Sequence, residues 1–196
     1  MRARHGPGRV SSDGGPFPRP QAARRAQPRT FRAPGIPGEV EEISETMKPM
    51  TTFNASREIP ATVEQVFAAI SDPERLSRWW GPDGFTNTFN VCEFKNGGRW
   101  SLIMHGPNGD NYPNENVFGE IESPGKVVIQ HVSEPKFRLT ITLASSAMGT
   151  VVSWAQAFES PEVASRLEHI VVPANEQNLE RLSVEVLRTK LTSLDE

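Results

Sequence analysis

Apolar residues after residue 60 first recur with the period of an α-helix. Residues 63–70 place four apolar side chains on one helical face, and Thr62 and Gln65 form a capping box in front of them. Pro73 follows Asp72, the usual arrangement of a first helical turn after an N-cap, and a second apolar face comes after it. The pattern therefore predicts two short helices.

The next part of the chain has the shorter period of β-strands. Apolar and polar side chains alternate most clearly over residues 136–144, and Gly, Asn and Pro residues separate consecutive segments. Strands are predicted over residues 52–59, 86–94, 99–105, 114–121, 126–132, 136–144 and 150–158. Because the turns after residue 86 are short, consecutive strands there should pair antiparallel.

Helical spacing returns after Ser160. Val172 and Pro173 should interrupt this helix, since a residue before proline avoids the α region. A longer helix then resumes at Ala174, with an apolar stripe that runs through Leu182. Together the elements predict an α+β fold in which a curved antiparallel sheet of about seven strands grips a long C-terminal helix. One helix cannot fill the whole concave side of such a sheet, so we expect a cavity between them.

The first fifty residues differ in composition from the rest of the chain. They hold 8 of the 17 prolines and 9 basic against 5 acidic residues, and they show neither period. We expect a disordered Arg/Pro/Gly-rich extension over residues 1–50 and one folded domain over residues 51–196. Three interpretations of the extension stay open: an over-extended start before a native start at Met47 or Met50, a basic tail that touches RNA or anionic membrane, and an organellar targeting segment.

Charge and composition bear on the class of protein. Residues 51–196 carry 12 basic and 19 acidic residues without a basic stripe, so we expect no nucleic-acid partner. No apolar run approaches the roughly 18–20 residues of a membrane span. The single cysteine, Cys92, cannot form an intrachain disulfide, which indicates a reducing compartment such as the cytoplasm. No metal-ligand spacing, phosphate loop or dinucleotide motif occurs, so no metal and no cofactor are predicted, while a homodimer stays open.

Three titratable side chains are candidates for acid–base chemistry. His131 shares a strand face with Val127 and Ile129 and should point inward, either as a satisfied core group or toward a ligand. His105 and Glu115 are the other candidates. A catalytic role would require the histidines to converge in the cavity.

Aromatic and polar residues on the strands and short helices are candidates for ligand binding. Trp79, Trp80 and Phe85 lie where the short helices meet the sheet, and either pack in the core or form the lip of a cavity. Gln156 is a lone polar residue on an apolar strand face, and must hydrogen-bond to protein, water or ligand. The predicted lining comprises Trp79, Phe85, Trp100, Met104, Tyr112, Phe118, His131, Trp154, Gln156 and Phe158.

Several short segments, in order along the chain, carry a family resemblance. They are Trp79-Trp80-Gly81-Pro82-Asp83-Gly84-Phe85-Thr86, Asn96-Gly97-Gly98-Arg99-Trp100, Met104-His105-Gly106-Pro107, His131-Val132-Ser133, Trp154 with Phe158, and Ala174-Asn175-Glu176-Gln177-Asn178. This set covers about Thr52 to Leu191. It resembles the bacterial proteins similar to the C-terminal domain of the heat-shock-protein-90 ATPase activator, in the SRPBCC (START-like, helix-grip) superfamily. The resemblance implies a helix-grip fold that holds lipids, polyketides or other apolar molecules between sheet and helix.

Three functions are compatible with the sequence. The first is binding of a small apolar ligand in a cavity between the sheet and the C-terminal helix. The second is a cavity enzyme of cyclase, dehydratase or hydrolase type that uses His or Glu acid–base groups, although no nucleophile motif is present. The third is an accessory protein of a chaperone ATPase. The activator has a separate N-terminal domain for chaperone contact, and residues 1–49 are too short to form one, which counts against this function.

Overall fold

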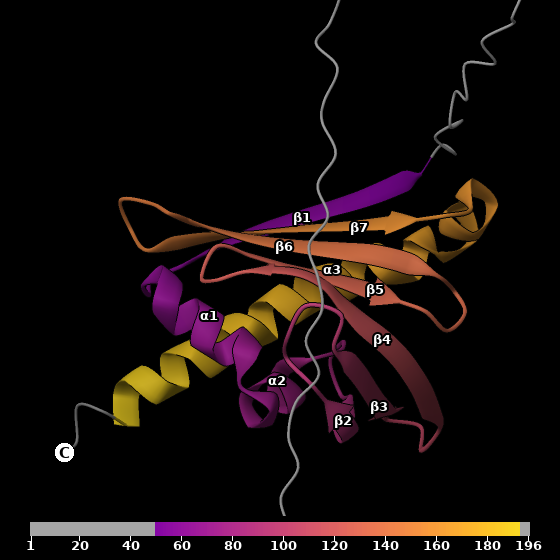
Figure 1. Ribbon diagram of the computed structural model, residues 1–196, viewed down its shortest axis with the longest axis horizontal. Helices are drawn as coiled ribbons and strands as arrows, with labels where there is room; N and C mark the ends of the chain where they lie inside the picture. The colour runs from indigo at the N-terminus through magenta and orange to yellow at the C-terminus, as the bar shows by residue number, and fades with distance from the viewer. Residues whose placement is uncertain (1–49, 193–196) are drawn as a thin grey trace, which may run out of the picture. The chain divides into compact units, whose positions relative to one another are not determined.

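The computed structural model describes residues 50–192, with side chains through residue 188 (Figure 1). The strands are β1 (Thr51–Ile59), β2 (Thr86–Cys92), β3 (Arg99–His105), β4 (Asn111–Glu122), β5 (Lys126–His131), β6 (Phe137–Ser145) and β7 (Thr150–Phe158). The helices are α1 (Val63–Ser71), α2 (Pro73–Trp79) and α3 (Pro161–Thr192). The predicted extension lies outside the described residues apart from Met50.

The seven strands form one antiparallel sheet in the order β1-β7-β6-β5-β4-β3-β2. The register shifts between Phe89 and Val91 in β2 and between Phe118 and Ile121 in β4, and such irregularities increase the local twist of a sheet. Figure 1 shows α3 crossing the concave side of the curved sheet. The predicted fold class is therefore confirmed, including the two short helices after the first strand.

Both short helices begin as their sequences predict. The Oγ1 of Thr62 accepts from the Gln65 amide at 3.3 Å, and Gln65 Oε1 accepts from the Thr62 amide at 3.0 Å, which completes the capping box of α1. Asp72 Oδ1 accepts from the Glu74 amide at 2.8 Å at the start of α2. Local sequence thus determines where each helix starts.

Helix α3 is continuous over Pro161–Thr192, so the predicted interruption at Val172 and Pro173 is wrong. Proline lacks the backbone N–H that would bond to the carbonyl four residues earlier, at His169. Both His169 and Pro173 are exposed, so water can hydrate this side of the helix. Packing of α3 against the rest of the fold outweighs the local cost of one missing hydrogen bond.

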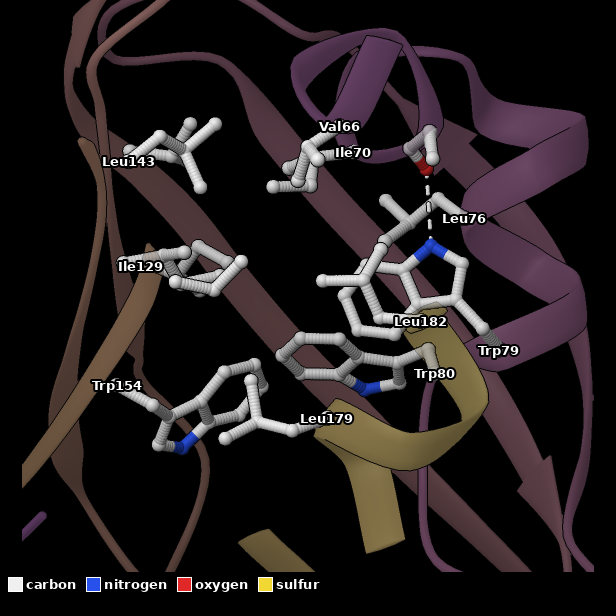
Figure 2. Close-up of a cluster of buried hydrophobic side chains, with 14 of the residues drawn as sticks. Val66, Ile70, Leu76, Trp79, Trp80, Ile129, Leu143, Trp154, Leu179 and Leu182 are labelled. Atoms are coloured by element: carbon white, nitrogen blue, oxygen red, sulfur yellow. Dashed lines mark hydrogen bonds between the residues drawn. The ribbon is translucent and has the colours of Figure 1, made fainter. Parts of the chain in front are cut away.

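The second half of α3 packs with α1 and α2 against the sheet (Figure 2). Trp79 is 1% exposed, and its indole Nε1–H donates to the Ala69 carbonyl at 2.9 Å. The buried stripe of α3 has the helical spacing that the sequence predicts. We call the group formed by Val66, Ile70, Leu76, Trp79, Leu182 and Val186 the filled end of the interior.

Candidate functional site

A pocket of about 240 Å³ lies between the sheet and the middle of α3. Its apolar walls comprise Trp80, Phe85, Met104, Phe137, Leu139 and Trp154, to which α3 adds Ile170, Val171 and Ala174. Its polar side chains are Asn114, Asn116, His131, Gln156, Asn175 and Asn178. No Asp, Glu, Lys or Arg is among the lining residues. We call this space the α3 pocket.

Trp80 separates the α3 pocket from the filled end. Its ring centroid lies 5.7 Å from that of Trp79 and 4.7 Å from that of Trp100. Its centroid is also 5.8 Å from that of Trp154, which lines the pocket (Figure 2). Aromatic pairs at such distances add to the stabilisation that burial alone gives. Trp80 is therefore held by aromatic contacts while one part of it lines the pocket.

The loop between α2 and β2 forms one edge of the pocket and is tied to α3 by Arg181. The Nη1 of Arg181 donates to the carbonyl of Gly81 at 2.6 Å and to that of Pro82 at 2.7 Å. Its Nη2 donates to the carbonyls of Arg78 and Phe85, both at 2.9 Å. Burial lowers the pKa of Arg181 from its usual value, yet an arginine keeps its charge at neutral pH. One side chain thus binds four backbone carbonyls between the end of α2 and the start of β2.

Two of the segments that carry the family resemblance meet at this edge. Asn178 Oδ1 accepts from the Gly81 amide at 2.8 Å across 97 residues of sequence, and Gln177 Oε1 accepts from the Asp83 amide at 3.0 Å. Gly81 has a φ of 96°, and a Cβ there would come within 2.6 Å of the Met104 methyl group. Only glycine fits this position without strain.

His131 is buried in β5 and is held at both ring nitrogens. Its Nδ1–H donates to the Pro135 carbonyl at 3.0 Å, and its Nε2 lies 2.8 Å from Asn114 Oδ1 and 3.2 Å from Ser133 Oγ. The ring stacks on Phe137 with centroids 4.6 Å apart. Burial lowers the pKa of His131 from its ordinary value of 6.5, against the opposing effect of the hydrogen bond to Pro135. Burial therefore favours the neutral form of the imidazole.

The polar groups of the pocket divide into paired and unpaired ones. Asn178 is fully paired, since its Nδ2 donates to the Ala174 carbonyl at 2.8 Å while its Oδ1 binds the loop. Gln156 is 8% exposed, and its amide has no hydrogen bond within the described residues. In the same part of the chain, Asn175 Nδ2 and Trp154 Nε1 are buried without a hydrogen-bond partner. The unpaired groups come from β7 and α3, on opposite sides of the pocket.

The structure brings half of the predicted lining to this pocket. Phe85, Met104, His131, Trp154 and Gln156 line it. Trp79, Trp100, Phe118 and Phe158 are each at most 1% exposed and pack within the core instead. Trp100, for example, stacks on Phe118 with centroids 5.5 Å apart, which fills the space beside both rings. Tyr112 is 43% exposed and packs beside Phe85 at 5.9 Å.

The candidates His105 and Glu115 do not line the α3 pocket. Asn116 lines it, and the adjacent Glu115 points to the opposite face of β4, where its Oε1 accepts from the Ser101 hydroxyl at 2.6 Å. His105 Nε2 lies 2.9 Å from Thr88 Oγ1. The three titratable candidates therefore do not meet in one cavity.

The prediction missed the contribution of α3 to the pocket. Asn175 and Asn178 line it without having been predicted to do so, while Trp80, left open between the core and the lip of a cavity, also lines it. The two asparagines share the helix face of Leu179 and Leu182, both 0% exposed. Amides that interrupt an otherwise apolar helix stripe were the available signal in the sequence.

A larger groove of about 630 Å³ between α2 and α3 has a polar and charged lining, including Arg78, Glu185 and Arg188, which form ion pairs. Glu185, 4% exposed, lies 2.9 Å from Arg78, 3.2 Å from Arg75 and 2.8 Å from Arg188. Burial would raise the pKa of Glu185, but hydrogen bonds from Arg78 and Arg75 lower it overall. This cluster joins two helices, and we interpret it as structural.

Other reactive chemistry is sparse in residues 50–188. No three His, Cys, Asp or Glu side chains there are grouped to hold a metal ion. Burial raises the pKa of the Cys92 thiol to about 11, so it carries no thiolate at neutral pH. Within the described helices, none has the length and apolar character needed to cross a membrane.

Solved structures from several bacteria share this fold. A crystal structure of a protein from Nitrosomonas europaea has a TM-score of 0.65 and 19% identity, and the match covers 71% of this chain and 96% of that one. A solution structure from Arthrobacter aurescens has a TM-score of 0.65 and 24% identity, covering 73% and 93%. The AHSA1-like protein from Aeromonas hydrophila has a TM-score of 0.59 and 19% identity, covering 72% and 95%. At these identities the likeness shows the fold alone.

The family itself is identified by sequence. No curated protein matches the chain significantly. One family profile, described as "Activator of Hsp90 ATPase homolog 1-like protein", matches residues 60–186, which span α1 to the buried stripe of α3. This match confirms the resemblance carried by the short segments. The chain therefore belongs to the Activator of Hsp90 ATPase homolog 1-like protein family.

Proposed function

We propose that this protein binds a small, largely apolar molecule in the α3 pocket. The observation that carries the proposal is a pocket of about 240 Å³ with mostly apolar walls, next to the buried core. Small-molecule sites in proteins are typically concave and mostly apolar, with a few polar groups. For comparison, an apolar cavity of about 150 Å³ is enough to bind benzene.

The pocket edge supports a site of fixed shape. Arg181 and Asn178 hold the α2–β2 loop against α3 through hydrogen bonds to backbone groups. A preformed pocket loses less conformational entropy when it binds a ligand than a mobile one does. We extend the proposal to the cytoplasm as the site of action, on the ground that Cys92 is the single cysteine.

Catalysis has less support than binding. His131 is the one titratable side chain of the pocket, and both of its ring nitrogens are engaged by Pro135, Asn114 and Ser133. A general base needs a free nitrogen within hydrogen-bond reach of its substrate. His105 and Glu115 do not line the pocket, and Glu115 is hydrogen-bonded to Ser101 on the opposite face of β4. Binding without turnover is therefore the function we propose.

A second candidate rests on the family description, which names an ATPase activator. An accessory protein of a chaperone ATPase would act through its outer surface and would need no ligand in the α3 pocket. The two functions make different predictions, because blocking the pocket would abolish ligand binding and leave chaperone binding intact.

The test is a titration of the full chain with ethylbenzene, followed by ¹H–¹⁵N NMR. Ethylbenzene should shift the signals of the pocket residues, and Ala174→Phe, which places a ring in the pocket, should abolish the effect. Ser165→Phe is the matched control, since Ser165 is exposed on the same helix. If ethylbenzene does not bind, or binds Ala174→Phe equally well, the proposed function is wrong. If Ala174→Phe does not fold, Ala174→Leu is used in its place.

A further inference from the structure

The charge of the α3 pocket depends on one side chain, His131. No Asp, Glu, Lys or Arg is among the lining residues, so the imidazole is the lining group that can change its charge near neutral pH. His131 is 7% exposed and stacks on Phe137, a second lining residue, with ring centroids 4.6 Å apart. Protonation of this ring therefore converts an uncharged pocket into a cationic one that contains no opposite charge.

The first set of hydrogen bonds at His131 fits the neutral ring. Its Nδ1 lies 3.0 Å from the Pro135 carbonyl oxygen, which can only accept, so Nδ1 carries a proton. Its Nε2 lies 3.2 Å from the Ser133 hydroxyl. The Ser133 oxygen already accepts from the Glu115 amide at 3.2 Å, and its own hydrogen is available to an unprotonated Nε2. The neutral imidazole is therefore bonded at both nitrogens.

Asn114 supplies a second partner that fits the charged ring. Its Nδ2 donates to the Tyr112 carbonyl at 2.8 Å, which orients the amide so that Oδ1 lies 2.8 Å from Nε2 of His131. An amide oxygen can only accept, so a hydrogen bond between these two atoms requires a proton on Nε2. The imidazolium would thus donate to Pro135 and to Asn114 at once. The ring can take up a proton without leaving its position.

The charges around His131 oppose each other. Burial is the largest effect and lowers the pKa of His131, while Glu134, in the loop after β5, acts in the opposite direction. Glu115 points to the other face of β4, and α3 adds no charged side chain to the pocket lining. A groove that shares His131 with the pocket has three charged lining residues, Lys136, Arg138 and Glu159. The ring thus favours the neutral form near neutral pH and takes up its proton in acid.

Resting on the proposed function, we propose that the α3 pocket takes an uncharged ligand whose binding is coupled to the loss of one proton from His131, so that acid releases the ligand. An apolar ligand against the ring excludes the water that would hydrate an imidazolium and offers no acceptor in return. The ligand therefore favours the neutral ring, and protonation weakens ligand binding by the same factor. Affinity is greatest above the ordinary pKa of 6.5 and falls as the pH drops through the lowered pKa of His131 in the free protein.

The experiment measures the dissociation constant of ethylbenzene for the full chain by ¹H–¹⁵N NMR at three values, about pH 7.5, 6 and 4.5, which bracket the range in which an imidazole titrates. In wild type, the dissociation constant should rise by at least about fivefold from the highest to the lowest pH. In His131→Gln it should stay constant within about twofold, since the coupled proton is absent. His169→Gln removes an exposed imidazole from α3 and is the matched control, which should keep the wild-type pH dependence.

A second readout needs no variant to fold. The ring signals of His131 in wild type report its pKa directly, and they are followed over the same pH range with and without saturating ethylbenzene. Ethylbenzene should lower the pKa of His131 and leave that of His169 unchanged.

The outcomes separate the coupling from the proposed function. If ethylbenzene binds equally well at all three pH values, or if the pH dependence survives in His131→Gln, the coupling is wrong and the proposed function stands. The coupling is also wrong if His131 takes up no proton over this range, or if ethylbenzene leaves its pKa unchanged. If ethylbenzene does not bind even at the highest pH, the proposed function fails and the coupling fails with it.

Discussion

The interior beneath α3 has two ends that were built from different residues and are packed to different degrees. The filled end, between α1, α2 and the second half of α3, contains aliphatic side chains and Trp79, whose indole N–H is hydrogen-bonded. The α3 pocket, under the middle of the same helix, contains amides, an imidazole and open space. Trp80 contacts both.

The difference shows how one helix can serve stability and binding at once. At the filled end, removal of a side chain leaves a void among close-packed neighbours, which costs stability. At the pocket, the space is already present and some polar groups have no partner in the described chain, so the native state is not at its stability optimum there. Unoptimised packing of this kind is typical of sites selected for function.

Leu182→Ala should have the largest effect. Leu182 is 0% exposed at the filled end, and its truncation should lower the free energy of unfolding by about 2–5 kcal/mol. Val184→Ala, 59% exposed on the same helix, is the control and should change stability by less than about 0.5 kcal/mol. Urea unfolding measures both, and a loss near zero for Leu182→Ala would mean that this helix face is not packed.

Glu185→Gln should have the next largest effect, a loss of about 1–3 kcal/mol, because Arg75 and Arg78 lose a buried charged acceptor. The pKa of Glu185 is lowered in the folded state, so its carboxylate stabilises the fold above the unfolded pKa of about 4.5. That contribution disappears as the pH falls through the folded pKa. The difference between wild type and Glu185→Gln should therefore shrink in acid. A constant difference from pH 7 to pH 3 would contradict this, and the exposed Glu176→Gln is the control.

Gln156→Leu should leave the ligand-free protein as stable as wild type or raise its stability by about 1 kcal/mol. The variant removes an amide that has no hydrogen bond within the described residues and adds an apolar side chain on a mostly apolar strand face. The control is Gln130→Leu, at a half-buried position in another strand. Thermal unfolding compares the stability of both variants with that of wild type. A loss above about 2 kcal/mol at Gln156 alone would show that its amide is paired within the fold, and the contrast between the two ends would weaken.

The pH-dependent part of the His131→Gln effect should be the smallest of these changes, and it comes on top of a constant loss of the hydrogen bonds and the Phe137 stacking that the imidazole makes. Burial lowers the folded pKa of His131 below 6.5, so the unfolded chain takes up a proton first as the pH falls. Wild type should therefore lose stability relative to the variant as the pH drops below about 6.5, by at most about 1.4 kcal/mol per pH unit. His169→Gln, on the exposed side of α3, is the control for removing one imidazole. Parallel stability curves for wild type and His131→Gln would contradict a lowered pKa.

The elements were predictable because their signals are local. The capping box at Thr62 and Gln65 and the Asp72 cap involve residues at most three apart, and both form as predicted. Strand alternation likewise depends on neighbours two residues away and is clearest over residues 136–144. The strand predicted over 114–121 lacks clean alternation, and β4 begins three residues earlier, at Asn111. The predicted break at Pro173 is wrong because packing along the whole helix outweighs the loss of one backbone hydrogen bond at the proline.

It was harder to predict which inward-facing residues pack in the core and which line the pocket. Trp79 and Trp80 are adjacent in sequence, yet one is sealed in the core and the other lines the pocket. Helix α2 ends at Trp79, so the direction of Trp80 is set by the extended backbone and loop that follow. Trp100 and Phe118 were expected to face a cavity, but they stack on each other.

By itself, the sequence determined the elements, their order and the family, because periodicity, caps and short segments depend on residues close together in the chain. Only the tertiary structure decided which end of the interior is filled and which stays open. That outcome depends on where the α2–β2 loop meets α3, through bonds such as Gly81 to Asn178 that span 97 residues. An amide on an apolar helix stripe marks an unusual position, but the sequence near it does not say which distant backbone group it binds.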